Sequence, residues 1–247
     1  MTKKQLFFFF AFDLLIMGLL LGYFFYPEEL KLTPEKTVVV KETSVINKPE
    51  ESIQLIQQRE NKRNNLTNEL SELETCQEND RCNFADTDPK AVYFAVSDAI
   101  KTKLINFKEQ ADSESIRLMG LRFITFDNDE VRLAALDLIA SQPPKADNIP
   151  SLIKGIKWST DPSVFKAGIM EFSRYPQQNP EITQFLLETI QSGAIFVKRE
   201  VAKQILPLLN PDNIQQFEQL LLTLPAKNAT TQNLKNTLLE YQESNSH

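Results

Sequence analysis

The feature that constrains this chain most is a pattern of large apolar residues that recurs every 33 residues. Four sets of positions carry the pattern, with a last step of 32 in the first two: Ile116, Ile149, Ile182 and Ile214; Met119, Leu152, Phe185 and Phe217; Val131, Val164 and Val197; Ile139, Phe172 and Ile205. Each unit holds two segments with helical spacing of apolar residues, separated by Pro or Asp-Asn breaks. A period of this length in paired helices is typical of an α-solenoid, whose pairs bury their faces by stacking. We therefore predict an all-α fold in which residues 113–247 form a helical repeat domain.

The second segment of each unit also carries a recurring charge motif. Asp127-Asn-Asp-Glu-Val131-Arg132 is followed by small residues, and Asp161-Pro-Ser-Val164 and Val197-Lys-Arg199 repeat parts of it. These segments resemble the second helix of a HEAT repeat over residues 113–225, although Phe165 replaces the Arg and the third copy lacks the Asp. Residues 226–243 are expected to form a capping helix with Leu234, Leu238 and Tyr241 facing inward, because terminal repeats are atypical.

The resemblance to HEAT arrays implies a scaffold that presents an extended surface, mostly on its second helices, to other macromolecules. Four basic residues would lie near such a surface and could meet an acidic partner: Arg132, Lys166, Lys198 and Arg199. The alternative for these residues is solvation or stacking with neighbouring Asp side chains. Trp158 is a candidate binding residue because Trp is enriched at interface hot spots, with packing between repeats as its alternative.

The N-terminal residues 1–26 are predicted to be an uncleaved transmembrane signal-anchor. From Leu6 to Tyr26 the chain carries one charge, Asp13, over a length that spans a bilayer core of roughly 30 Å as a helix. A cleaved signal peptide would have a shorter apolar run and small residues at a cleavage site, and neither is present. Asp13 is interpreted as a contact with another membrane helix or a proton relay, or alternatively as a tolerated, protonated or snorkelling side chain.

Residues 27–49 are predicted to be an extended tether, because they contain Pro27, Pro34 and Pro49 and show no helical period. Residues 50–112 are predicted to form a helical hairpin whose turn holds Cys76 and Cys82. Its second helix is expected over about residues 89–108. We expect a structural disulfide across this turn; free thiols, a redox pair or a metal site are the alternatives.

A structural disulfide requires an oxidising compartment. Because the Lys residues on either side of the anchor nearly balance, the cysteines decide the orientation. The chain is therefore expected to cross the inner (plasma) membrane once, with a cytoplasmic N-terminus and a periplasmic or otherwise extracytoplasmic C-terminal domain.

Composition argues against most familiar enzyme classes. The only His is His247, the last residue, so no ordered His base is available to a Ser or Cys nucleophile. Six Gly residues form no phosphate-binding loop, and a net charge of −6 without a basic segment argues against nucleic-acid binding. Paired carboxylates such as Asp127 and Asp129 are a possible hydrolase site, but Asp at a helix start ordinarily acts as a cap.

The sequence therefore favours a membrane-anchored scaffold, not an enzyme, that binds another protein of the cell envelope. We predict no catalytic residues, metal or cofactor, and the sequence does not define a small-molecule ligand. The alternative is an accessory subunit of an energised envelope transport or secretion complex, in which Asp13 acts within the membrane.

Overall fold

Helices account for every regular element that the computed structural model describes, which confirms the predicted all-α class for this part of the chain. The described residues are 48–79, 81–84, 88–175 and 179–245. The predicted anchor with Asp13, and the predicted tether up to residue 47, lie outside them. None of the helices within the described ranges is both long enough and apolar enough to cross a bilayer.

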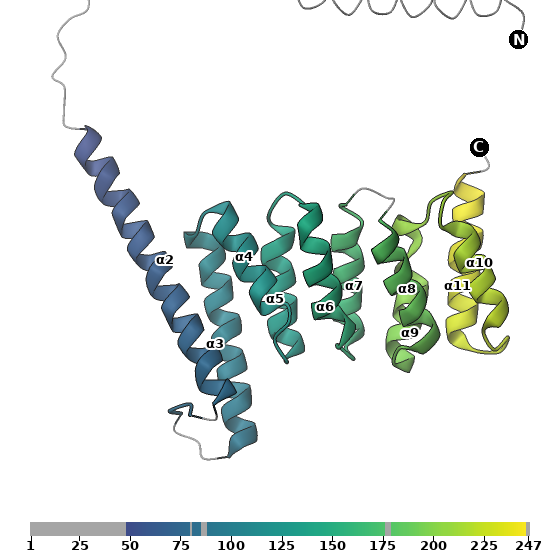
Figure 1. Ribbon diagram of the computed structural model, residues 1–247, viewed down its shortest axis with the longest axis horizontal. Helices are drawn as coiled ribbons and strands as arrows, with labels where there is room; N and C mark the ends of the chain where they lie inside the picture. Colours follow the sequence, from purple (N-terminus) through teal and green to yellow (C-terminus); the bar gives the residue numbers. More distant parts are fainter. Residues whose placement is uncertain (1–47, 80, 85–87, 176–178, 246–247) are drawn as a thin grey trace, which may run out of the picture. The chain divides into compact units, whose positions relative to one another are not determined.

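The helices follow one another as consecutive pairs that stand side by side (Figure 1). The first helices of the pairs are α2 (Lys48–Glu78), α4 (Ser113–Phe123), α6 (Ile149–Lys157), α8 (Pro180–Ser192) and α10 (Ile214–Thr223). The second helices are α3 (Pro89–Gln110), α5 (Asp129–Ala140), α7 (Pro162–Phe172), α9 (Ile195–Gln204) and α11 (Ala229–Ser244). Short 3₁₀ helices, η1 (Ala146–Asn148) and η2 (Leu206–Leu208), lie in connections between pairs.

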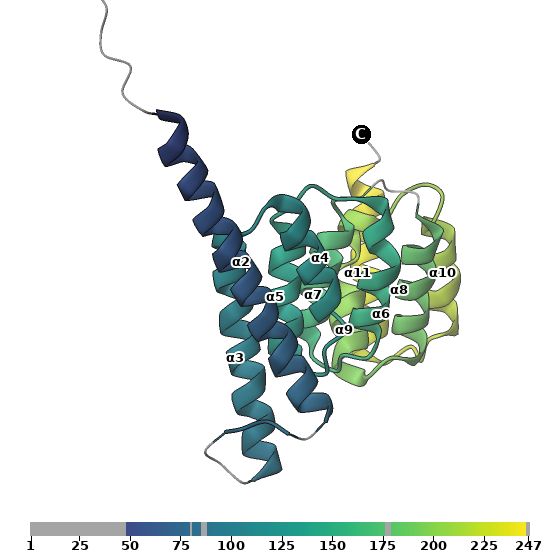
Figure 2. The ribbon, with the colours of Figure 1, turned by 60° about the vertical axis from the view of Figure 1, so that its left-hand side comes forward.

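The second helices form the more closely packed of two layers. Each of α3, α5, α7, α9 and α11 packs on the next, whereas contacts between successive first helices are fewer. In Figure 2, α2 and α3 lie at the left, the second helices α5, α7, α9 and α11 lie in the middle, and the first helices α6, α8 and α10 lie along the right-hand side. The turn inside each pair lies at the end of the stack where the α2–α3 connection is found, and we call this end the turn edge.

The apolar pattern in the sequence forms the core between these layers. Every position of the four sets is buried, except Ile214, which is half-buried. The inward-facing residues expected near the C-terminus follow the same rule, since Leu234 and Leu238 are buried and Tyr241 packs on the core.

The pattern continues at both ends of the predicted repeat domain. Val96 in α3 is 35 residues before Val131 and is fully buried, and Thr230 in α11 is 33 residues after Val197 and is 1% exposed. Because α3 packs on α5 and α11 packs on α9, the hairpin and the C-terminal helix are layers of the same stack. The described residues accordingly belong to one compact unit that begins at Asn47.

Asx residues and prolines set the starts of the helices. Side chains of Asp88, Asp112, Asn128, Asp161, Asn179 and Asn228 accept hydrogen bonds from backbone N–H groups in the first turns of the helices that follow them. Such caps satisfy donors that the helix itself leaves unpaired. Pro162 and Pro180 are the first residues of α7 and α8, where a backbone N–H would have no acceptor within the helix.

The predicted disulfide joins Cys76, in the last turn of α2, to Cys82 in the connection to α3. The two Cα atoms are 4.7 Å apart, and both side chains pack against the core. The bond therefore fixes the end of α2 where it turns toward α3.

Removal of this disulfide is expected to lower stability by about 2 kcal/mol, because the bond closes a short loop in the unfolded chain. For a domain of this size, that loss lowers Tm by roughly 4–8 °C. Thermal unfolding of the Cys76→Ser/Cys82→Ser variant, followed by circular dichroism, measures the change. Reduction of the wild-type protein should give the same shift, and an unchanged Tm in both experiments would show that the bond contributes nothing.

Acid is expected to destabilise the start of α4. Hydrogen bonds from Ser115, with a further one from Arg63, lower the pKa of Asp112 to about 2. Hydrogen bonds from Arg117 and Lys145 lower the pKa of Glu114 to about 2. Both values lie below those of the unfolded chain, so this stability is present above about pH 4 and is lost as pH falls toward 2.

The Asp112→Asn variant keeps a capping residue but removes the charge. The difference in urea midpoint between wild type and this variant should therefore shrink as pH falls from about 5 to about 2. A difference that stays constant over this range would contradict the assignment.

Candidate functional site

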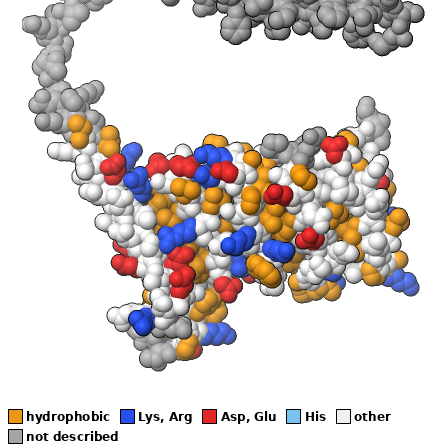
Figure 3. Space-filling view, in the orientation of Figure 1, with side chains coloured by type: hydrophobic (Ala, Val, Ile, Leu, Met, Phe, Trp, Pro, Cys, Tyr) orange, Lys and Arg blue, Asp and Glu red, His pale blue; other side chains and the backbone are white. Residues whose placement is uncertain are grey.

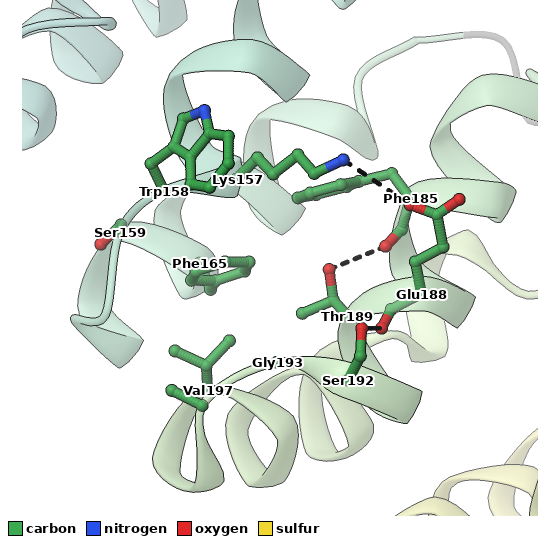
Figure 4. A pocket seen from close by; sticks show the side chains of 11 residues that line it. Lys157, Trp158, Ser159, Phe165, Phe185, Glu188, Thr189, Ser192, Gly193 and Val197 are labelled. Atoms are coloured by element: carbon green, nitrogen blue, oxygen red, sulfur yellow. Dashed lines mark hydrogen bonds and ion pairs between the residues drawn. The ribbon is translucent and has the colours of Figure 1, made fainter.

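A groove at the turn edge separates the α6–α7 pair from the α8–α9 pair (Figure 4). It has a volume of about 290 Å³. We call it the turn groove, and its lining residues are Lys157, Trp158, Ser159, Phe165, Phe185, Glu188, Thr189, Ser192, Gly193, Ala194 and Val197. Because these residues come from the ends of α6 and α8 and the starts of α7 and α9, the groove is built by two adjacent turns.

The floor of the turn groove is formed by buried apolar side chains. Phe165, Phe185 and Val197 are each no more than 5% exposed. The rings of Phe165 and Phe185 stack with centroids 6.1 Å apart, and the rings of Phe172 and Phe185 form a T-shaped pair with centroids 6.0 Å apart. A floor of buried aromatic side chains favours an apolar occupant.

The polar groups of the groove are mostly occupied by the protein itself. Thr189 and Ser192 donate their hydroxyl hydrogens to backbone carbonyls of α8, at 2.7 Å in each case. Ser159 donates to a carboxylate oxygen of Asp129, also at 2.7 Å. Lys157 and Glu188 form a long, solvent-exposed ion pair of 3.9 Å on the rim. The hydroxyl groups of the groove therefore already have hydrogen-bond partners within the protein.

Trp158 stands at the mouth of this groove with 74% of its surface exposed. It ends α6 in helical backbone conformation, beyond the last packed turn. At the start of α9, Ile195 and Phe196 are 54% and 64% exposed. Exposed side chains of this size beside an apolar hollow are typical of a protein-binding surface.

Gly193 makes the second of the two turns possible. A Cβ atom at this position would lie 2.6 Å from the carbonyl oxygen of Thr189, which is closer than side-chain atoms approach backbone oxygens. Because the chain passes so near the end of α8, α9 begins directly beside the groove.

Sequence reasoning identified Trp158 but missed Ile195 and Phe196. The missed signal is the residue type just before the recurring buried Val. This residue is Phe196 before Val197, whereas the two preceding units have Glu130 and Ser163 at the same position. An aromatic residue at a position that is otherwise polar marks an exposed face.

The structure separates the four basic residues predicted to contact a partner. Arg132 is buried, and its guanidinium bonds to Asp129 at 2.7 Å and reaches Asp127 at 3.5 Å. Lys198 is half-buried and donates to the carbonyl of Gln191 at 2.6 Å. Lys166 is exposed on α7, and Arg199 is half-buried on α9 with its guanidinium over the ring of Phe196.

Of the paired carboxylates considered for hydrolysis, Asp129 is held in hydrogen bonds and Asp127 points to solvent. Asp129 receives hydrogen bonds from Arg132 and Ser159, whereas the Asp127 side chain is 98% exposed. The described residues contain no group of three His, Cys, Asp or Glu side chains that could hold a metal ion.

A buried polar network was not expected from the sequence. Arg117 donates to Asn148 at 2.6 Å, Asn148 donates to the hydroxyl of Tyr175 at 3.0 Å, and Tyr175 donates to Glu171 at 3.0 Å. Burial raises the pKa of Tyr175 to about 12. These residues join the α4–α5 and α6–α7 pairs, and they lie below the surface at the opposite end of the stack from the turn edge.

Charged side chains of both signs are mixed over the face shown in Figure 3, with hydrophobic side chains exposed between them. A surface that tracks a nucleic-acid backbone would instead need clustered basic residues.

Searches of protein-family models, curated proteins and solved structures find no match to this chain.

Proposed function

We propose that this protein is a membrane-anchored, extracytoplasmic scaffold that binds another protein of the cell envelope. In this proposal the stacked helix pairs form a HEAT-like solenoid, and the anchor predicted for residues 1–26 holds it at the membrane. The turn groove receives an apolar side chain of the partner.

The observation that carries the proposal is Trp158, an exposed aromatic side chain beside the apolar floor of Phe165 and Phe185. Interface hot spots combine large aromatic side chains with pockets from which water is excluded. The groove binds by shape and apolar contact, since its hydroxyl groups already have partners within the protein.

The compartment assignment is supported by the disulfide between Cys76 and Cys82, because such bonds persist in oxidising compartments. Reporter fusions after residue 50 test this assignment. A periplasmic reporter should be active there, and activity of a cytoplasmic reporter at the same position would contradict it.

Photo-cross-linking in the cell that produces the protein tests the binding function. A photoreactive phenylalanine analogue replaces Trp158 in the full, anchored chain, and captured proteins are identified by mass spectrometry. A matched chain carries the probe at Leu222, which is 87% exposed on α10.

We expect one envelope protein to be captured from position 158 and not from position 222. Absence of capture at position 158, or the same set of proteins from both positions, would contradict the proposal.

A further inference from the structure

The outward faces of α7 and α9 carry three basic side chains that form no ion pair with a carboxylate in the described ranges: Lys166, Arg199 and Lys203. Lys166 and Lys203 are exposed, and Arg199 is half-buried. Elsewhere in the same layer, Lys101 pairs with Glu130 and Lys108 pairs with Asp137. Lys90 on α3 and Lys235 on α11 are also exposed and without a carboxylate partner in the described ranges, but each stands singly on its helix, whereas α7 and α9 bring three unpaired cations together.

These cations lie together because the two helices share one register. Lys166 stands two residues after the buried Val164, and Arg199 stands two residues after the equivalent Val197. Met170 and Lys203 share the position four residues later. Since α7 and α9 pack side by side, with axes about 8–10 Å apart as usual for packed helices, these side chains occupy one surface.

Apolar side chains lie among the charges. Met170 and Phe196 are 62% and 64% exposed, and the guanidinium carbon of Arg199 lies 5.8 Å from the centre of the Phe196 ring. We call Lys166, Met170, Phe196, Arg199 and Lys203 the basic patch. Such a mixture of apolar surface and cations complements an amphipathic acidic surface.

The surroundings of the basic patch limit the length of what it binds. Glu200 lies on α9 beside the cations and accepts a hydrogen bond from Gln204, and Glu130 and Asp137 project from the adjoining part of the layer. A long polyanion that followed the layer from α9 to α5 would meet these carboxylates. A short acidic segment confined to α7 and α9 would meet the three cations and, of these carboxylates, only Glu200.

We propose that the basic patch binds a short acidic segment of a partner protein. Carboxylates of the segment lie against Lys166, Arg199 and Lys203, and apolar side chains of the segment lie against Met170 and Phe196. This inference rests on the proposed scaffold function and names the chemistry of its partner.

Photo-cross-linking from position 170 of the full chain, in the cell that produces it, tests the inference. Met170 is exposed, so the probe does not disturb the core. We expect the captured peptide to come from a protein segment with an excess of Asp and Glu and at least one large apolar residue. Capture of lipid, of a nucleic acid, of a second copy of this chain, or of nothing would overturn the proposal.

Charge reversal identifies the interaction that holds the segment. The Lys166→Glu/Lys203→Glu variant changes two exposed residues and should lower the capture yield at least about tenfold, because attraction becomes repulsion. Exchange of carboxylates in the captured segment for Lys should restore the yield in this variant. The control, Lys227→Glu, reverses an exposed charge in the α10–α11 turn and should leave the yield unchanged.

A yield that is insensitive to the Lys166→Glu/Lys203→Glu change would overturn the proposal. Capture from position 158 without capture from position 170 would reject the basic patch and leave the scaffold function intact. Loss of capture from both positions would reject both.

Discussion

Replacement of Trp158 by alanine is expected to weaken binding of the captured partner by about 2 kcal/mol or more, which is roughly a 30-fold increase in Kd. The physical reason is the position of the side chain: its large apolar surface is 74% exposed in the free protein and lies beside an apolar hollow. Burial by the partner therefore removes this surface from water, and alanine offers little to bury. Titration of the purified full-length proteins by isothermal calorimetry gives the change.

The matched control for this variant is Leu222→Ala. Leu222 is more exposed than Trp158, but it does not line the turn groove. We expect the Leu222→Ala variant to bind the partner with the wild-type Kd, and the Tm of both variants to stay close to the wild-type value. Equal losses from both substitutions would show that exposed apolar area, and not the groove, determines binding.

The largest loss of stability is expected from Phe172→Ala, at about 3–5 kcal/mol. Phe172 is 1% exposed, belongs to the recurring apolar pattern, and packs its ring against Phe185. Truncation leaves a cavity in the middle of the stack and removes support from the floor of the turn groove. Urea unfolding of the full chain in a mild detergent measures the loss.

Phe196→Ala removes the same side chain from a site that is 64% exposed. Its free energy of unfolding should stay within about 0.5 kcal/mol of the wild-type value. Similar losses for the two Phe variants would contradict the assignment of Phe172 to the core.

The sequence was sufficient to predict the all-α class, the disulfide and most of the core, because each depends on local spacing. Stacked helix pairs impose a recurring buried position, and Val131, Val164 and Val197 display it at a constant interval. Two further members escaped this reasoning. Val96 is displaced by an interval of 35 residues, and Thr230 is polar although it is 1% exposed.

The candidate site was only partly predictable, because exposure depends on how neighbouring turns are placed. Trp158 was recognised by its residue type, but the sequence left open whether it packs between repeats or faces solvent. The resemblance to a HEAT repeat placed Arg132 near the binding surface. In the structure its guanidinium forms an ion pair with Asp129, and the Arg132 side chain is buried. Phe196 stands out only when the repeat units are aligned, because the equivalent residues, Glu130 and Ser163, are polar.

Hydrogen–deuterium exchange of the full chain, alone and with the captured partner, shows whether the partner covers the turn groove. We expect the partner to slow exchange at the two turns that form the turn groove, around residues 157–161 and 193–197, and to leave exchange in the α10–α11 turn unchanged. Slowed exchange confined to other parts of the stack, with both of these turns unaffected, would contradict this expectation.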